Sequence, residues 1–184
     1  MSKGAATLFH VSRAEGEITR FSPFSHFGTY QAAVDRGRSS VCRDAEALRI
    51  YEVSISARSP LKMRDLSGGS APAVHSAVKL ADELFYGRAR VLDADERARV
   101  FHAGYPDASN TTPSGWSEAA ALGELAAILA AKGYDCIVYK NAYEDPGSLS
   151  LIAIDPGIVE IVSVSDFRPD GVAEEDAPGV GPAP

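Results

Sequence analysis

The stretch from Lys132 to Asp155 constrains the fold more than any other part of the chain. Within it, Ile137–Tyr139 and Leu151–Ile154 are short apolar runs, and two such runs joined by turn-forming residues are typical of a β-hairpin. The connection, Lys140–Ser150, is long for a hairpin, and long connections held by a rigid scaffold are often binding or catalytic sites. The alternative is a solvated loop in which Asp145–Gly147 only turns the chain.

A helix leads into this hairpin. Ser117 is placed to cap a helix over Glu118–Lys132, and Gly133 follows where a left-handed residue often ends a helix. Further strands are expected at Thr7–Val11, Leu48–Ala57 and Ile158–Val164, and further helices at Gln31–Arg36, Ala73–Phe85 and Asp93–Phe101. This order predicts an α+β fold rather than a regular alternation of strands and helices.

Composition sets the broad class. With 184 residues, 45% of them hydrophobic, the chain is long enough for one domain with a core, which we expect over residues 1–167. Residues 168–184 are rich in Ala, Gly, Pro and acidic residues and are expected to form a mobile tail. No apolar run reaches membrane-spanning length and no secretory leader is visible, so we expect a protein that is cytoplasmic, or delivered into the cytoplasm of a target cell, with no membrane partner. Cys42 and Cys136 are expected to be reduced, structural thiols.

The net charge and the absence of several known motifs exclude some classes of function. The net charge is −7, and this acidity argues against a duplex nucleic acid held by neutralised phosphates. The sequence lacks a nucleotide-binding glycine fingerprint, a phosphate-loop lysine motif, a zinc-type cysteine pair and a nucleophile elbow. We therefore expect no metal site.

Four stretches, taken in order, carry a resemblance to a known family. They are Leu8–Ser12, Ser25–Thr29, Ile50–Leu61 and Gly133–Asn141, the last followed by Glu144, Gly147, Ser148, Ser150 and the run Leu151–Asp155. Together they resemble the ADP-ribosyltransferase superfamily, and most closely the transferase-like domains of phage and mobile-element polyvalent proteins. The resemblance implies a split core of mixed and antiparallel β-sheet with flanking helices.

The family's chemistry implies NAD as the substrate. Its members cleave the nicotinamide glycosidic bond and transfer ADP-ribose to an acceptor, through a transition state with oxocarbenium character on the ribose. Such a site has to hold a bent dinucleotide and place negative charge or hydrogen-bond acceptors beside that ribose.

The first two stretches would hold the dinucleotide. By resemblance, His10 hydrogen-bonds the hydroxyls of the adenosine-side ribose, and Ser12 belongs to the same NAD-binding set. Phe27 and Tyr30 are the aromatic residues that can sandwich the nicotinamide ring, and Gly28 lets a substrate approach the backbone closely. The structural alternatives are a histidine that ends a strand and a phenylalanine in the core.

Other polar residues complete the predicted binding set. Thr29 is a candidate to hydrogen-bond the substrate or only to cap the following helix, and His26 is a candidate to contact a phosphate. Arg13 and Arg20 are the nearby arginines that can pair with the pyrophosphate. From the hairpin, the resemblance adds Asn141 and Ser148 to the NAD-binding residues.

The hairpin departs from the family at the catalytic acid. Better-known members place a glutamate where this chain has Ser150, which can hydrogen-bond the ribose but supplies no charge. Glu144, three residues after Asn141, is the first candidate for the functional acid, Asp145 the second, and Glu118 the third. We take Glu144 and Ser150 as the predicted catalytic residues.

Three functions follow from this set of residues. The first is an NAD-dependent ADP-ribosyltransferase that acts on a macromolecule, a protein rather than a nucleic acid, as a toxin, a phage effector or an inhibitor of a host system. The second is a binding or inhibitory module on the same fold that has lost catalysis, which the serine at position 150 motivates. The third is an NAD glycohydrolase that needs no acceptor. Acceptor choice would lie in loops such as Gly104–Gly115.

Overall fold

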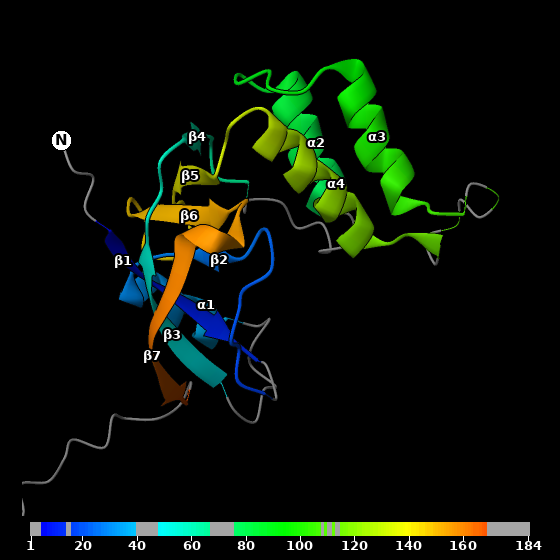
Figure 1. Cartoon of the computed structure of the whole chain (residues 1–184). Coiled ribbons are helices and arrows are strands. Elements are labelled where there is room, and N and C mark those ends of the chain that lie inside the picture. Colours follow the sequence, from blue (N-terminus) through cyan, green and yellow to red (C-terminus); the bar gives the residue numbers. More distant parts are fainter. Residues whose placement is uncertain are drawn as a thin grey trace, which may run out of the picture.

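Two β-sheets and a group of helices make up the fold (Figure 1). The structure is a computed structural model, and it describes residues 5–13, 16–39, 48–66, 76–107, 109, 112 and 115–168. The α+β class with a split sheet, expected from the sequence, is confirmed. Cys42 and the tail from residue 169 lie outside the described residues, as do several residues of the predicted acceptor loop between Gly104 and Gly115.

The sheets have three and four strands. The first, sheet A, is antiparallel in the order β1 (Ala6–Ser12), β3 (Leu48–Ile55) and β7 (Val159–Phe167). The second, sheet B, has the order β2 (His26–Phe27), β6 (Leu149–Ala153), β5 (Cys136–Lys140) and β4 (Pro60–Lys62), with β4 parallel to β5. A short 3-10 helix, Pro156–Ile158, connects β6 to β7.

The described helices begin and end at the residues that the sequence indicated, within a few positions. They are α1 (Tyr30–Arg38), α2 (Ser76–Tyr86), α3 (Ala94–Gly104) and α4 (Glu118–Ala131). Thr29 and Ser117 cap α1 and α4 as expected, because their hydroxyls accept hydrogen bonds from backbone N–H groups of the first turn. Gly133 has a φ of +86°, the left-handed conformation that favours glycine after a helix.

Sheet B separates two apolar cores. On one face, Ile137 and Ile152 pack in a cluster with buried residues of α2, α3 and α4. On the other face, Cys136 and Leu151 pack with Tyr51 of sheet A. The alternation of side chains along each strand produces this division, since successive residues point to opposite faces. Figure 1 shows the three helices gathered on one side of sheet B, with sheet A on the other.

The hairpin predicted from the sequence is confirmed. β5 and β6 pair antiparallel from Cys136 with Ala153 to Lys140 with Leu149. Residues 141–148 form the connection, closed at its base where the Asn141 N–H donates to the Ser148 carbonyl at 2.9 Å. This fixes the start and end of the chemically rich loop on a rigid strand pair.

The end of β3 differs from the expectation for a visible reason. The strand predicted to run to Ala57 ends at Ile55, and the chain resumes strand structure at Pro60. The Asp135 carboxylate is the reason, because it accepts hydrogen bonds from the N–H groups of Arg58 at 2.6 Å and of Ser59 at 3.0 Å and so turns the chain. β4 can then pair with β5. Among the described helices, none has both the length and the apolar character to cross a bilayer.

The helix-facing core should carry much of the stability. Leu125 of α4 is fully buried, so Leu125→Ala should lower the free energy of unfolding by about 2–5 kcal/mol through lost burial and a cavity. Leu149→Ala is the matched control, because that side chain is 67% exposed and its loss should change stability by less than about 0.5 kcal/mol. Urea unfolding measures both, and equal losses would contradict this placement of the core.

Candidate functional site

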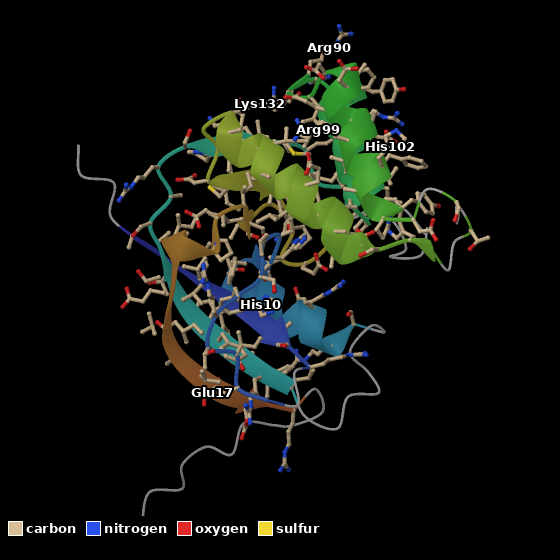
Figure 2. All side chains as sticks on the ribbon, turned by 45° about the vertical axis from the view of Figure 1, so that its right-hand side comes forward. His10, Glu17, Arg90, Arg99, His102 and Lys132 are labelled. Atoms are coloured by element: carbon tan, nitrogen blue, oxygen red, sulfur yellow. The ribbon has the colours of Figure 1, made fainter. Side chains whose placement is uncertain are left out.

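A cavity of about 480 Å³ opens where the two sheets and α1 meet. Its wall comes from residues 9–11 of β1, residues 24–28, the face of α1 that carries Arg36, and the hairpin. Volumes of this size are common for small-molecule sites, which are usually apolar clefts with a few converging polar groups. Figure 2 shows His10, one of the lining residues, in the middle of the molecule, whereas Arg90, Arg99, His102 and Lys132 lie above it, in the helices or just beyond their ends.

The structure brings most of the predicted site residues to this cavity. Seven line it: His10, His26, Phe27, Gly28, Asn141, Glu144 and Ser150. Four are not among the lining residues: Ser12, Thr29, Tyr30 and Ser148. Residues far apart in sequence therefore converge on one concave surface.

His10 is held by the backbone of the neighbouring strand. Its Nδ1 lies 2.8 Å from the His26 carbonyl oxygen, which only accepts, so Nδ1 carries the proton. Burial lowers the pKa of His10 below its ordinary value, and the bond to the carbonyl opposes this shift. His10 is therefore a neutral imidazole at pH 7, and Nε2 has a free lone pair.

His26 lies in the cavity wall beside Tyr139. Its Nδ1 is 3.2 Å from the Tyr139 hydroxyl. By accessible surface His26 is exposed, and it lines the cavity, so the protein atoms that crowd its ring are those of the cavity wall. This desolvation, followed by the positive charges of Arg36 and His10, lowers the pKa of His26 to about 4, against the raising effect of Asp65.

Gly28 joins the two sheets and makes room for the cavity. Its N–H donates to the Phe9 carbonyl at 3.0 Å, and its own carbonyl accepts from the Phe9 N–H at 2.8 Å. A Cβ at position 28 would lie 3.0 Å from both Ala32 Cβ and Ser150 Oγ. Because both backbone polar groups are already used, Gly28 contributes space rather than a hydrogen bond to a ligand.

Phe27 and Tyr30, the two aromatic residues of the predicted sandwich, have different surroundings. Phe27 is 1% exposed, and its ring packs edge-on against Phe21 with centroids 4.9 Å apart. Tyr30 is 54% exposed and packs edge-on against Phe9. The burial of Phe27 in the core cluster favours the alternative in which it is a core residue, and the sandwich stays a prediction.

Asn141 and Ser150 are buried polar residues in the cavity wall, each 4% exposed. Asn141 Nδ2 donates to Ser150 Oγ at 2.6 Å and to Ser148 Oγ at 3.2 Å. Its Oδ1 is buried and has no hydrogen-bond partner among the described residues. Ser148 thus supports Asn141 from outside the lining. Desolvation raises the pKa of the nearby Tyr139 hydroxyl to about 12, and Ser150 opposes this shift.

The hairpin loop is fastened to the start of α1. The Thr29 hydroxyl donates to the Asp145 carboxylate while it caps the helix. The Asp145 N–H donates to the Asp35 carboxylate at 3.1 Å. Asp145 also has a φ of +50°, which is uncommon outside glycine and is held here by these contacts. The contacts of Thr29 and Asp145 therefore serve to hold the hairpin loop against α1.

Glu144 is the acid that lines the cavity. Its carboxylate lies 3.6 Å from the Arg36 guanidinium, and its side chain is 24% exposed. Of the other two acid candidates, Asp145 faces Thr29, and Glu118 accepts hydrogen bonds from the Ala77 N–H and the Trp116 indole in the helical part. The geometry leaves Glu144 as the candidate with access to a ligand.

Sequence reasoning missed Arg36 and Tyr139. Arg13 and Arg20, the predicted phosphate partners, are not among the lining residues, whereas Arg36 is. Helical spacing contained the signal, since residues 32, 33 and 36 share one face of the helix that Thr29 caps. Tyr139 is in β5 two residues before Asn141, which follows directly after the strand, and both line the cavity. Within the described residues, no group of His, Cys, Asp and Glu is arranged to hold a metal ion.

Comparison with known proteins adds one structural likeness. No protein-family model matches the chain, and no curated protein is similar to it in sequence. Among solved structures, it is similar to a chain of the M. tuberculosis MbcT–MbcA toxin–antitoxin complex, with 14% identity and a TM-score of 0.43. The match covers 90% of this chain and 85% of that chain.

Gly28 should tolerate no side chain. In Gly28→Ala the new Cβ would press on Ala32 and Ser150, so we expect a loss of about 1–3 kcal/mol in the free energy of unfolding. Gly123→Ala is the matched control, because Gly123 lies in α4 with nothing within 4 Å of the added Cβ. That variant should gain about 0.5–1 kcal/mol. Chemical unfolding of both variants tests the prediction, and an unchanged Gly28→Ala would contradict it.

The neutral state of His26 should make the fold sensitive to acid. A pKa lowered by folding means that the unfolded chain binds the proton more tightly. The stabilisation is present above pH 6.5 and is lost as the pH falls from 6.5 toward about 4. Urea unfolding at several pH values should therefore show a smaller loss of stability on acidification in His26→Gln than in the wild type. Parallel pH profiles of the two proteins would contradict the shift.

Proposed function

We propose that this protein is an NAD-dependent ADP-ribosyltransferase whose active site is the cavity at the junction of the two sheets. One observation carries the proposal: the segments around His10, Gly28 and Asn141, which carry the resemblance to that superfamily, line a single cavity of about 480 Å³. They are separated in sequence by up to 131 positions, as the numbers of His10 and Asn141 show. Polar residues that are distant in sequence and converge on one cavity are typical of a ligand-binding or active site.

The cavity walls suit a nucleotide. Phe9, Val11, Phe24 and Ala33 supply apolar surface, and the polar groups of His10 and its neighbours lie among them. A flat ring would pack against the apolar part while hydroxyls meet the imidazoles. We assign the Nε2 lone pair of His10 to a ribose hydroxyl, since a neutral acceptor favours a hydroxyl donor.

Arg36 is the proposed contact for the pyrophosphate. It lines the cavity, and its side chain is half exposed, so the guanidinium can reach a ligand without leaving the helix. Its distance of 3.6 Å from Glu144 is an ion-pair contact longer than a normal hydrogen bond. A phosphate oxygen would replace a loose contact with a charge-assisted hydrogen bond.

Glu144 is the proposed catalytic acid. Breaking the nicotinamide bond leaves positive charge on the ribose, and a carboxylate beside it lowers the energy of that transition state. Ser150 supplies no charge, and it is buried and hydrogen-bonded to Asn141. We therefore assign the electrostatic role to Glu144, and to Ser150 a hydrogen bond that helps to orient the ribose.

The released ADP-ribose would pass to a protein acceptor rather than to duplex nucleic acid, because the chain is acidic. A role as a toxin, phage effector or inhibitor of a host system belongs to the same proposal. The alternative function is a binding module without catalysis, and the serine at position 150 favours it. Hydrolysis of NAD without an acceptor is the remaining alternative.

Nicotinamide release from NAD tests the proposal. Glu144→Gln should lower kcat by about 10²-fold or more while NAD binding by calorimetry is kept, because the change removes charge and little volume. His10→Ala should mainly weaken binding. Glu124→Gln is the matched control, since Glu124 pairs with Arg99 in the helical part.

Three outcomes separate the functions. Transfer of labelled ADP-ribose to a host lysate supports the transferase, and nicotinamide release without labelled macromolecules supports the glycohydrolase. NAD binding without turnover in the wild type supports the binding module. No NAD binding at all would refute the assignment of this cavity.

A further inference from the structure

The hairpin loop that carries Glu144 is joined to α1 through the residue that follows Glu144 in the chain. The Asp145 carboxylate accepts a hydrogen bond from the Thr29 hydroxyl, and the Asp145 N–H donates to the Asp35 carboxylate at 3.1 Å. We propose that Asp145 and Asp35 are positioning residues, which place the Glu144 carboxylate in the cavity beside Arg36. This inference rests on the proposed function, because that function assigns the catalytic charge to Glu144.

The second half of the loop is a β-turn that its own sequence favours. The Ser148 N–H donates to the Asp145 carbonyl at 3.1 Å, which closes a four-residue turn. Pro146 occupies its second position and Gly147, with a φ of +96°, its third, as is typical of a type II turn. The Gly147 N–H also donates to the Asn141 carbonyl at 2.9 Å. The path of the chain from Asp145 to β6 is therefore set.

The first half of the loop is held by a different element. The Ala142 N–H donates to the Asp65 carboxylate at 2.8 Å, and Asp65 follows β4 closely in the sequence. Tyr143 and Glu144 lie between Ala142 and Asp145, and the Tyr143 side chain is 59% exposed. Packing of Tyr143 therefore contributes little to the placement of Glu144, which depends on the residues held on either side.

Consecutive residues of α1 contact consecutive residues of the loop. Asp35 accepts from the Asp145 N–H, and the Arg36 guanidinium lies 3.6 Å from the Glu144 carboxylate. Gln31, one turn earlier in the helix, donates to the Asp35 carboxylate at 2.7 Å, so Asp35 is itself held in place. The bond from Asp35 to the backbone of the loop thus places the loop where the Glu144 carboxylate meets Arg36.

The backbone conformation of Asp145 connects its two bonds to the placement of Glu144. Its φ is +50°, in the left-handed region that aspartate and asparagine tolerate better than most residues. The bonds to Thr29 and Asp35 offset the cost of that conformation. Without them, Asp145 would return toward a negative φ. Because the turn and β6 fix the chain after Asp145, this rotation would move Glu144 rather than the turn.

Variants of Asp145 separate placement from charge. Asp145→Ala should lower kcat for nicotinamide release by about tenfold or more and change NAD affinity in calorimetry by less than about twofold, because a displaced Glu144 no longer stabilises the transition state. Asp145→Asn should keep kcat within about threefold of the wild type, since asparagine accepts from Thr29 and tolerates the left-handed conformation. If Asp145→Asn were as slow as Asp145→Ala, the charge of Asp145 would itself act on the substrate, and the positioning role would be overturned.

A double variant shows whether Asp145 acts through Glu144. In the Glu144→Gln background, Asp145→Ala should change kcat by less than about twofold, because the charge to be placed is already absent. Two losses that multiply would overturn the proposal. Asp93→Ala is the matched control, since the Asp93 carboxylate also accepts from a backbone N–H, that of Glu96 at 2.8 Å, at the start of α3. It should leave kcat unchanged, and an equal loss there would assign the effect to general destabilisation and overturn the proposal.

Amide hydrogen exchange tests the link in the free protein, without NAD. The Asp145 N–H should be protected in the wild type, and Asp35→Ala should speed its exchange by about tenfold or more, because the acceptor is lost. The Ala142 N–H, which Asp65 holds, is the internal reference and should change by less than about twofold. Asp35→Ala should also lower kcat as Asp145→Ala does, and it serves if Asp145→Ala does not fold.

The two proposals fail in different ways. An Asp145 N–H that exchanges freely in the wild type would overturn the positioning role, whatever the activity. A protected Asp145 N–H in a wild type that releases no nicotinamide would refute the proposed function and leave the link between loop and helix intact. Nicotinamide release at the same rate in the wild type, Asp145→Ala and Asp35→Ala would overturn the positioning role alone.

Discussion

The pair of backbone hydrogen bonds between Phe9 and Gly28 is the contact on which the site depends. It ties an edge strand of sheet A to sheet B, at 2.8 and 3.0 Å, and the cavity lies beside this contact. Only a residue without a side chain fits there, because Ala32 and Ser150 both lie 3.0 Å from where a Cβ would stand. Gly28 thus links the two sheets through its backbone and leaves the space of the cavity free. A side chain at position 28 would fill part of that space and press on the contact between the sheets.

Hydrogen bonds join the hairpin loop to α1 beside the polar side of the cavity. Asp145 bonds Thr29, which caps α1, and Asp35 within α1, so the loop is fixed to the helix. This leaves the Arg36–Glu144 contact, at 3.6 Å, as the loosest polar link between loop and helix. A ligand with negative charge can enter at that contact at small cost, since a partly exposed ion pair contributes little to stability.

The sequence predicted the elements where local physical chemistry decides. Alternation along residues 48–55, the cap at Ser117 and the glycine at 133 all act within a few residues, and the structure agrees with them. It did not reveal the three-residue strand β4, because a strand that short owes its existence to a distant partner. The Asp135 carboxylate, which holds the turn at Arg58, is such a partner, and no local pattern reports it.

The same distinction between local and long-range effects applies to the candidate site. The resemblance indicated the segments, but roles that depend on burial were beyond it: Phe27 reads as a stacking aromatic in sequence and is a core side chain in the fold. Tyr139 shows the converse, because a strand tyrosine in an apolar run looks like core, and only the fold brings its hydroxyl to 3.2 Å from His26 Nδ1. Strand register decides this placement. A shift of one residue would turn Tyr139 to the other face and take its hydroxyl away from His26, so the register of β5 on β6 affects the chemistry of the cavity as well as its shape.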